Sequence, residues 1–187
     1  MSAAFNTVET TSGEAEQSAR RPISVASLVA VEGPDFHQVD VSALVFESVK
    51  LLEATRRIRG NKVKLELPDD AVLARTGQRR TRQVLLLLLA HASDCAGEGE
   101  VRLTLAPPDD FGDEPPRFQV VAPEARLSER ELRSVFLSPM LVGAVHRRLA
   151  RARELVESLG GTLTAERGAE VGLTVTVELP APGLACW

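Results

Sequence analysis

The chain has 187 residues, enough for one domain with a sizeable hydrophobic core and a tail, without disulfides or a structural metal. Hydrophobic residues make up 44% and charged residues 26%, which is typical of globular proteins. A net charge of -4 and an aromatic content of 4%, with no Tyr, argue against a nucleic-acid-binding surface, which needs positive charge and stacking faces.

The N-terminal part of the chain is polar, and regular patterns begin near residue 36. Residues 1–22 predict a flexible tail, and residues 23–35 predict a strand or an extended linker. Apolar side chains then recur every three or four residues over Val41–Arg59, which predicts an amphipathic helix that ends at Gly60-Asn61. Alternating side chains predict a strand over Lys62–Leu67.

The middle of the chain predicts a second helix followed by a hairpin. The helix is expected from about Gln78 to Cys95, and Thr76 is the nearest side chain able to cap it. Its run Val84–Leu89 is apolar nearly all round, which favours a helix packed on both sides over the alternative, part of a dimer surface. Glu100–Leu105 and Arg117–Val121 predict the two strands of the hairpin.

The remaining elements complete an α+β domain. Ser128 and Glu131 form the pattern of a capping box, and Gly160-Gly161 is a stop signal for a helix. The elements expected in chain order are a short helix over Ser128–Phe136, a long helix over Gly143–Leu159, and strands over Thr162–Glu166 and Gly172–Leu179. Together these elements predict a two-layer α/β sandwich over residues 36–182, with helices on one face of a mixed sheet, followed by a tail over residues 183–187.

Six short segments, in their order and spacing, carry a resemblance to a known family. They are Phe36–Val41, Arg82–Leu85, Gly99–Val101, Val135-Phe136, Arg153–Gly161 and Val177–Pro180. With these segments the chain resembles the catalytic and ATP-binding domain of bacterial sensor histidine kinases, part of the ATPase superfamily shared with gyrase and Hsp90. The resemblance covers roughly residues 36–182. The residues before it are too few and too polar to predict the family's dimerisation and phosphoacceptor helices.

The resemblance also implies where magnesium would bind, and this chain departs from the family there. In the family, two asparagines lie on the pocket face of the second helix, and the second one holds the Mg²⁺ that bridges the ATP phosphates. This chain has Leu87 and His91 at those places. Leucine offers no lone pair, and Mg²⁺ prefers oxygen ligands to imidazole. We therefore expect no cofactor at this position.

Two further motifs of the family are changed as well. An Asp-x-Gly-x-Gly motif reads adenine in the family, and here Ala122 replaces the Asp while Glu124 and Arg126 add bulk where glycine gives clearance. A glycine-rich loop cradles the phosphates in the family, and the segment Pro139–Arg148 has one glycine. We therefore expect a non-catalytic, histidine-kinase-like domain that serves as a protein-interaction or regulatory module in bacterial two-component-type signalling.

Two other functions remain open, and candidate residues for partner binding can be named. The alternatives are a divergent ATP-binding kinase or ATPase domain with unrecognised nucleotide ligands, and a DNA-associated regulator. Arg147, Arg148 and Arg151 form a candidate surface for an acidic protein partner, such as a kinase or a receiver domain, and a homodimer is a further possibility. The competing interpretation is a solvated helix face balanced by Glu154 and Glu157.

The remaining polar residues predict little chemistry. His91 is expected to fill the core edge beside Leu87, with a phosphoacceptor or metal ligand as the alternative, while His37 and His146 are expected on the surface. No spacing unites the three histidines as ligands, and Cys95 and Cys186 form no C-x-x-C pair. The acidic residues at the hairpin tip favour a solvated loop over calcium binding; they are Asp109, Asp110, Asp113 and Glu114. Asp94, Glu129 and Glu131 show no pairing that would identify a general acid and a general base.

The sequence also bears on location. Residues 1–21 contain no apolar stretch like the core of a signal peptide. The longest apolar run, Val84–Ala90, is much shorter than the roughly 20 residues that cross a bilayer. With two widely separated cysteines, the sequence favours a reduced, cytoplasmic protein.

Overall fold

A computed structural model describes residues 36–58, 63–109, 114–137, 143–168 and 172–180. The tail expected over residues 1–22, the linker over 23–35 and the tail over 183–187 lie outside these ranges. In chain order the elements are β1 (Phe36–Asp40), α1 (Val41–Ala54), β2 (Val63–Glu66), β3 (Leu73–Gly77), α2 (Gln78–Ala96), β4 (Val101–Ala106), β5 (Arg117–Ala122), α3 (Glu129–Leu137), α4 (Arg147–Ser158), β6 (Thr162–Arg167) and β7 (Leu173–Glu178).

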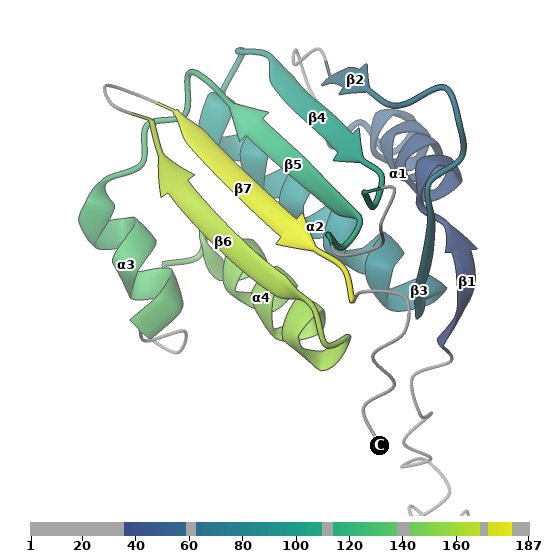
Figure 1. Ribbon diagram of the computed structural model, residues 1–187. Coiled ribbons are helices and arrows are strands. Elements are labelled where there is room, and N and C mark those ends of the chain that lie inside the picture. Colours follow the sequence, from purple (N-terminus) through teal and green to yellow (C-terminus); the bar gives the residue numbers. More distant parts are fainter. Residues whose placement is uncertain (1–35, 59–62, 110–113, 138–142, 169–171, 181–187) are drawn as a thin grey trace, which may run out of the picture. The chain divides into compact units, whose positions relative to one another are not determined.

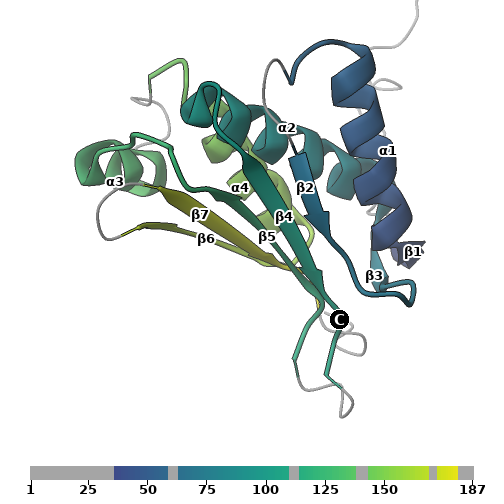
Figure 2. The ribbon, with the colours of Figure 1, turned by 90° about the horizontal axis from the view of Figure 1, so that it is seen from above.

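Five strands form one mixed sheet in the order β2-β4-β5-β7-β6, in which β2 and β4 run parallel and the other neighbours run antiparallel. Helices α2 and α4 lie behind the sheet in Figure 1, and the view from above shows them on one face of it (Figure 2). The fold class predicted from the sequence is therefore confirmed, as are the central and the closing hairpins.

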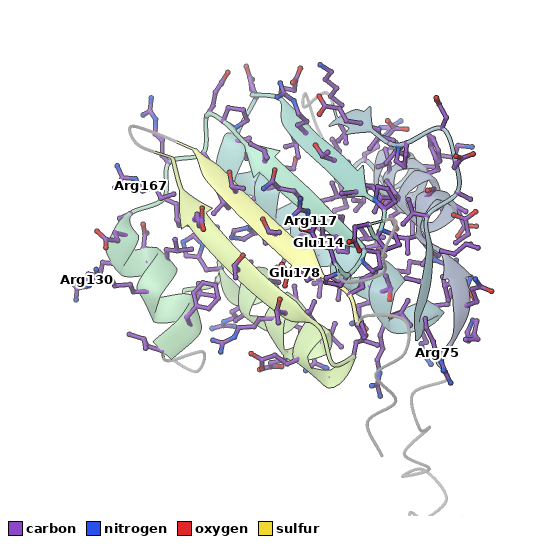
Figure 3. All side chains as sticks on the ribbon, viewed as in Figure 1. Arg75, Glu114, Arg117, Arg130, Arg167 and Glu178 are labelled. Carbon is purple, nitrogen blue, oxygen red and sulfur yellow. The ribbon has the colours of Figure 1, made fainter. Side chains whose placement is uncertain are left out.

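The alternation of side chains along the strands explains the two layers. Every second residue of β4, β5 and β7 is buried, and these apolar side chains face the helices. The other face of the sheet is polar: Arg117 and Glu178, which lie opposite each other on β5 and β7, are on this face in Figure 3. A sheet with one apolar face needs helices on that side only.

Helix α2 lies at the centre of the helical layer. It packs against α1 and α4 and against the strands β4 and β5. Leu85, Leu88 and Leu89 are buried, while Leu86 and Leu87 are partly buried and pack against the same core. The apolar run is therefore used inside the domain, as predicted for a helix packed on both sides.

Strands β1 and β3 were not predicted, and they form a separate antiparallel pair. In the sequence, Phe36–Asp40 lies directly before the first predicted helix and shows no clear strand pattern. The segment Leu73–Gly77 was not assigned, because its buried side chains are the small Ala74 and Thr76 rather than large apolar ones. Asp40 then ends β1 and caps α1, since its carboxylate accepts a hydrogen bond from the Ala43 amide at 3.0 Å.

Helix α1 ends at Ala54, five residues before the predicted end at Arg59. The hydroxyl of Thr55 donates to the carbonyl oxygens of Leu51 and Leu52, and Arg56 takes a positive φ of 52°. This local bonding competes with continuation of the helix. The expected stop signal, Gly60-Asn61, lies outside the described residues.

The start of α2 also differs from the prediction. Gly77 is its N-terminal cap residue, and no side chain of the described residues caps it. Thr76 belongs to β3, and its hydroxyl bonds to the buried hydroxyl of Thr81 at 3.0 Å. By contrast, the capping box of α3 is confirmed: the Glu131 amide donates to Ser128 Oγ at 3.2 Å, and the Ser128 amide donates to Glu131 Oε2 at 2.9 Å.

Helix α4 begins at Arg147 rather than at Gly143. The His146 amide donates to the Gly143 carbonyl at 3.0 Å, so these residues form a turn before the helix. The predicted end is confirmed, because Gly160 has a φ of +78° and a Cβ at Gly161 would lie 2.4 Å from the Glu178 carbonyl oxygen. The positive φ favours glycine at position 160, and the close approach leaves room only for glycine at position 161.

Candidate functional site: two histidines and a thiol between α2 and α4

Helices α2 and α4 run antiparallel, which brings the end of one to the beginning of the other. At one end, a Cβ on Gly77 would lie 3.3 Å from Leu159 Cδ2. At the other end, Asp94 of α2 forms an ion pair with Arg148 of α4. The C-terminal half of α2 therefore faces the first turn of α4.

Three polar side chains meet at this second end. His91 Nε2 lies 3.2 Å from His146 Nδ1, and the two rings are edge to face with centroids 5.5 Å apart. Cys95 Sγ lies 3.6 Å from His91 Nε2. His91 and Cys95 share one face of α2 because they are four residues apart, and His146 comes from the residue before α4.

The structure corrects the expectation for His146. This histidine was expected on the surface, yet it is only 9% exposed, and His91 is 0% exposed. His91 is thus buried, as predicted, but it contacts a second histidine that lies 55 residues away in the sequence. His37 is exposed on β1 and does not join this group. The spacing of residues along the chain held no signal for this pairing.

The surroundings favour a particular arrangement of hydrogens on the two rings. His146 Nε2 lies 3.8 Å from Glu131 Oε1, so its hydrogen is best placed on Nε2, facing the carboxylate. His146 Nδ1 then accepts a hydrogen bond from His91 Nε2. His91 Nδ1 has no hydrogen-bond partner among the described residues, and a bare lone pair there costs less than an unpaired N–H.

Burial favours the neutral forms of His91 and Cys95. Desolvation is the main cause that lowers the pKa of His91 to about 4; repulsion from a protonated His146 and from Arg148 adds to it, and Asp94 opposes it. Desolvation and the carboxylates of Asp94 and Glu131 raise the pKa of the Cys95 thiol to about 11. Hydrogen bonds from Ser128 are the main cause of a lowered pKa of Glu131. At neutral pH the His91 imidazole and the Cys95 thiol are therefore both neutral.

The positions at which the resemblance places nucleotide ligands do not suit Mg²⁺. Leu87 is partly buried and packs against the core, and His91 is turned toward His146. Neither side chain supplies an oxygen atom, which is the donor that Mg²⁺ prefers. The residues at positions 87 and 91 therefore do not fit a magnesium–nucleotide complex bound in the family's way.

The residues at the position of the adenine motif lie next to this cluster. Ala122 is fully buried at the end of β5, while Glu124 and Arg126 line an open pocket of about 450 Å³ together with Asp94, Cys95, Ala96 and Gly97. The side chain of Glu124 lies so close to Gly99 that a Cβ there would be 2.7 Å from its Oε2. The pocket thus brings the C-terminal end of α2, including Cys95, together with the changed positions of the β5–α3 turn.

The arginines singled out from the sequence lie in two separate places. Arg147, Arg148 and Arg151 are near the start of α4, and Arg79, Arg80 and Arg82 are in the first turns of α2, at the far end of the antiparallel pair. Arg147 is exposed, Arg148 pairs with Asp94, and Arg151 Nη1 lies 2.6 Å from Glu154 Oε2. Arg153 joins α4 to α3, since it donates to the Phe136 carbonyl at 2.8 Å and lies over the Phe136 ring.

The acidic residues mostly serve local structure. Asp109 accepts a hydrogen bond from the Glu114 amide at 2.7 Å, which closes the described part of the hairpin loop, and Asp110 and Asp113 lie outside the described residues. Glu131 caps α3, and Asp94 pairs with Arg148. Among the described residues, none of the helices combines the length and the apolar character that crossing a bilayer requires.

No protein-family model and no curated protein sequence matches this chain. Solved structures match its fold. The catalytic domain of histidine kinase ThkA, in a nucleotide-free form, has 22% identity and a TM-score of 0.65, and the match covers 79% of this chain and 96% of that one. Full-length ShkA in complex with AMPPNP has 21% identity and a TM-score of 0.62, covering 79% of this chain and 31% of that one.

A second ThkA structure, in complex with the response regulator protein TrrA, has 22% identity and a TM-score of 0.63. That match covers 80% of this chain and 42% of the other. These similarities show that the chain has the fold of histidine kinase catalytic domains, as the resemblance implied.

Proposed function

We propose that the chain is a non-catalytic domain of the histidine-kinase fold, which acts as a protein-interaction or regulatory module in bacterial two-component-type signalling. The chemistry of α2 carries the proposal. Leu87 packs against the core and His91 is buried against His146, where the family places its two asparagines. These two side chains offer Mg²⁺ no oxygen, although the hydrophobic core of the domain is kept. We therefore expect the domain to act through its surface.

A titration with a fluorescent ATP analogue and Mg²⁺ tests the loss of nucleotide binding. The divergent ATP-binding domain is the second candidate, because ShkA, which shares this fold, was solved with AMPPNP. ShkA serves as the positive control under the same conditions. We expect no saturable signal from this chain. Micromolar binding that unlabelled ATP competes away would overturn the proposal in favour of the second candidate.

The start of α4 is the surface that we propose for the partner. Arg147 and Arg151 are exposed there, and Arg148 lies beside them in its ion pair with Asp94. Arginine binds carboxylates in a bidentate manner, so an acidic protein surface such as that of a receiver domain would fit. The complex of ThkA with the response regulator TrrA supports a protein partner for this fold.

A charge-reversal experiment tests this surface. The double variant Arg147→Glu/Arg151→Glu is compared with Arg75→Glu/Arg130→Glu, which reverses the same number of charges on β3 and α3, where both arginines project outward in Figure 3. Arg148 is left unchanged so that its ion pair with Asp94 is kept. In a pull-down from the native cell extract, the first variant should lose partners that the second retains. Identical partner sets for both variants would remove α4 as the surface.

The third function, a DNA-associated regulator, has a separate test. Binding through phosphate contacts weakens steeply as salt is added. Duplex DNA should therefore not be retained by this chain even at low salt, as its negative net charge suggests. Retention that falls steeply with salt would replace the protein-interaction proposal with a nucleic-acid function.

A further inference from the structure

We propose that His91, Cys95 and His146 bind a zinc ion. One donor atom from each of the three side chains lies within 4.8 Å of the other two. Two imidazoles and a thiolate are the donor types that zinc prefers, in contrast to the oxygen donors that suit magnesium. The proposal rests on this cluster alone and does not depend on the function proposed above.

Two of the three distances between the donor atoms match tetrahedral coordination, and the third, between Cys95 and His146, is at most 4.8 Å. With a Zn–N bond of about 2.05 Å and a Zn–S bond of about 2.3 Å, a tetrahedral ion holds two nitrogens about 3.3 Å apart and a nitrogen and a sulfur about 3.6 Å apart. His91 Nε2 and His146 Nδ1 are 3.2 Å apart, and His91 Nε2 and Cys95 Sγ are 3.6 Å apart. To bind the same ion, the donors of Cys95 and His146, which lie within 4.8 Å of each other, would come to about 3.6 Å.

The backbone holds two of the side chains on a helix and the third in the turn that begins the next helix. His91 and Cys95 are on consecutive turns of α2, a helix buried along most of its length. His146 is held at the start of α4, because its amide donates to the Gly143 carbonyl and its carbonyl accepts from the Ala150 amide. Ligands on a helix are held more rigidly than ligands on loops, and the backbone hydrogen bonds of His146 fix the turn that carries the third one.

An outer carboxylate supports one of the ligands. Glu131 Oε1 lies 3.8 Å from His146 Nε2, the ring nitrogen that would not bind the metal; this is an ion-pair distance, longer than a hydrogen bond. Metal-binding histidines commonly donate that second N–H to a carboxylate, which orients the ring and increases its basicity. Glu131 is itself held by Ser128, whose amide and hydroxyl both donate to its Oε2. The outer contact therefore connects α3 to the proposed site.

Coordination would rearrange the protons of the cluster. Binding through Nε2 places the hydrogen of His91 on Nδ1, which has no partner among the described residues, and the metal bonds must exceed that cost. Cys95 binds as the thiolate, so one proton leaves the thiol for solvent when the ion enters. Asp94 and Glu131, which lie near Cys95, balance part of the positive charge of the ion.

A metal ion would reach the cluster from the pocket that Cys95 lines. This residue lines the open pocket of about 450 Å³, whereas His91 is fully buried. Three protein donors leave a fourth tetrahedral position, which we expect to face the pocket and to take a water molecule or an external ligand. The site would thus occupy the part of α2 where the resemblance places the magnesium ligand, with soft donors in place of hard ones.

Cobalt(II) provides the test, because a cobalt–thiolate bond gives a charge-transfer band that zinc lacks. The full chain, reduced and freed of metal by a chelator, is titrated with Co²⁺ and then with Zn²⁺. We expect one Co²⁺ per chain with a thiolate charge-transfer band, and displacement of Co²⁺ by Zn²⁺. The absence of that band in the reduced, folded chain would refute the site.

Matched variants assign the ligands. Cys95→Ser should abolish the band, while Cys186→Ser, which changes the other cysteine, should leave it intact. His146→Gln should weaken Co²⁺ binding by much more than His37→Gln, and Glu131→Gln, which keeps the capping pattern of α3, should weaken it about tenfold. A band that survives Cys95→Ser and disappears in Cys186→Ser would overturn the assignment.

A thermal-shift measurement covers the case of a variant that folds poorly. Zn²⁺ should raise the melting temperature of the native chain and of Cys186→Ser, and it should not raise that of Cys95→Ser. Circular dichroism of each metal-free variant shows whether it is folded. An equal shift in the native chain and in folded Cys95→Ser would show that zinc binds elsewhere, and would refute the site.

Discussion

Acidification of the metal-free protein should destabilise it through His91. The side chain is fully buried against His146, and its pKa is lowered from 6.5 to about 4 in the folded state. His146 and Arg148 contribute to this lowering, whereas Asp94 opposes it. Because the unfolded chain takes up a proton on His91 at a higher pH than the folded chain, the free energy of unfolding falls as the pH drops through 6.5.

The magnitude follows from the difference between the two pKa values. Each pKa unit corresponds to about 1.4 kcal/mol, so the complete loss, reached below about pH 4, is about 3 kcal/mol. Between pH 7 and pH 5 the loss from His91 is about 2 kcal/mol, because the unfolded-state histidine is almost fully protonated at pH 5 while the folded one is still largely neutral. Most carboxylates remain ionised over this interval.

Urea denaturation at pH 7 and pH 5, with a chelator and a reducing agent present, measures the effect. His91→Gln is the matched control, since its amide can still donate to His146 Nδ1 but does not titrate. The native chain should lose about 2 kcal/mol more than His91→Gln over this interval. Equal pH dependence in the two proteins would refute the argument that burial keeps His91 neutral.

Three further predictions concern helices α2 and α3. Leu88→Ala, in the buried centre of α2, should cost about 2–5 kcal/mol in urea denaturation, whereas Leu137→Ala, at a side chain 79% exposed, should change stability by less than about 0.5 kcal/mol; similar values for both would contradict the assigned core. Ser128→Ala should cost about 1 kcal/mol by removing the capping box of α3, and Ser128→Thr should restore most of it; equal losses would show that the hydroxyl plays no part. In a metal-free Cys186→Ser background, alkylation of Cys95 at pH 8 should be about 100-fold slower in the folded than in the unfolded chain, because its pKa is raised from 9.0 to about 11; equal rates would place the thiol in solvent.

Local patterns in the sequence predict most of the helices and strands. The alternating apolar residues of β4, β5 and β7, the nearly continuous apolar run of α2 and the Ser128/Glu131 capping box each act within a few residues, so the chain itself contains the signal. The ends of helices were less predictable. Thr55 ends α1 through side-chain bonds to its own helix, a competition that hydrophobic periodicity does not register.

The two short strands β1 and β3 escaped prediction for a related reason. They pair only with each other, and the buried side chains of β3 are small, so neither strand has the large alternating apolar residues that identify a strand. Their register is decided by pairing between segments that are more than 30 residues apart, from Phe36 opposite Gly77 to Asp40 opposite Leu73.

The sequence by itself determined the α+β class, the order of the main elements and the absence of oxygen donors from the side chains at positions 87 and 91, because periodicity and residue chemistry are local properties. It also placed His91 and Cys95 on one face, since a spacing of four residues has that meaning on any helix. Only the tertiary structure decided that His146 is buried and meets them. That contact depends on the antiparallel packing of α2 on α4 and on the turn before α4, and no spacing along the chain specifies either one.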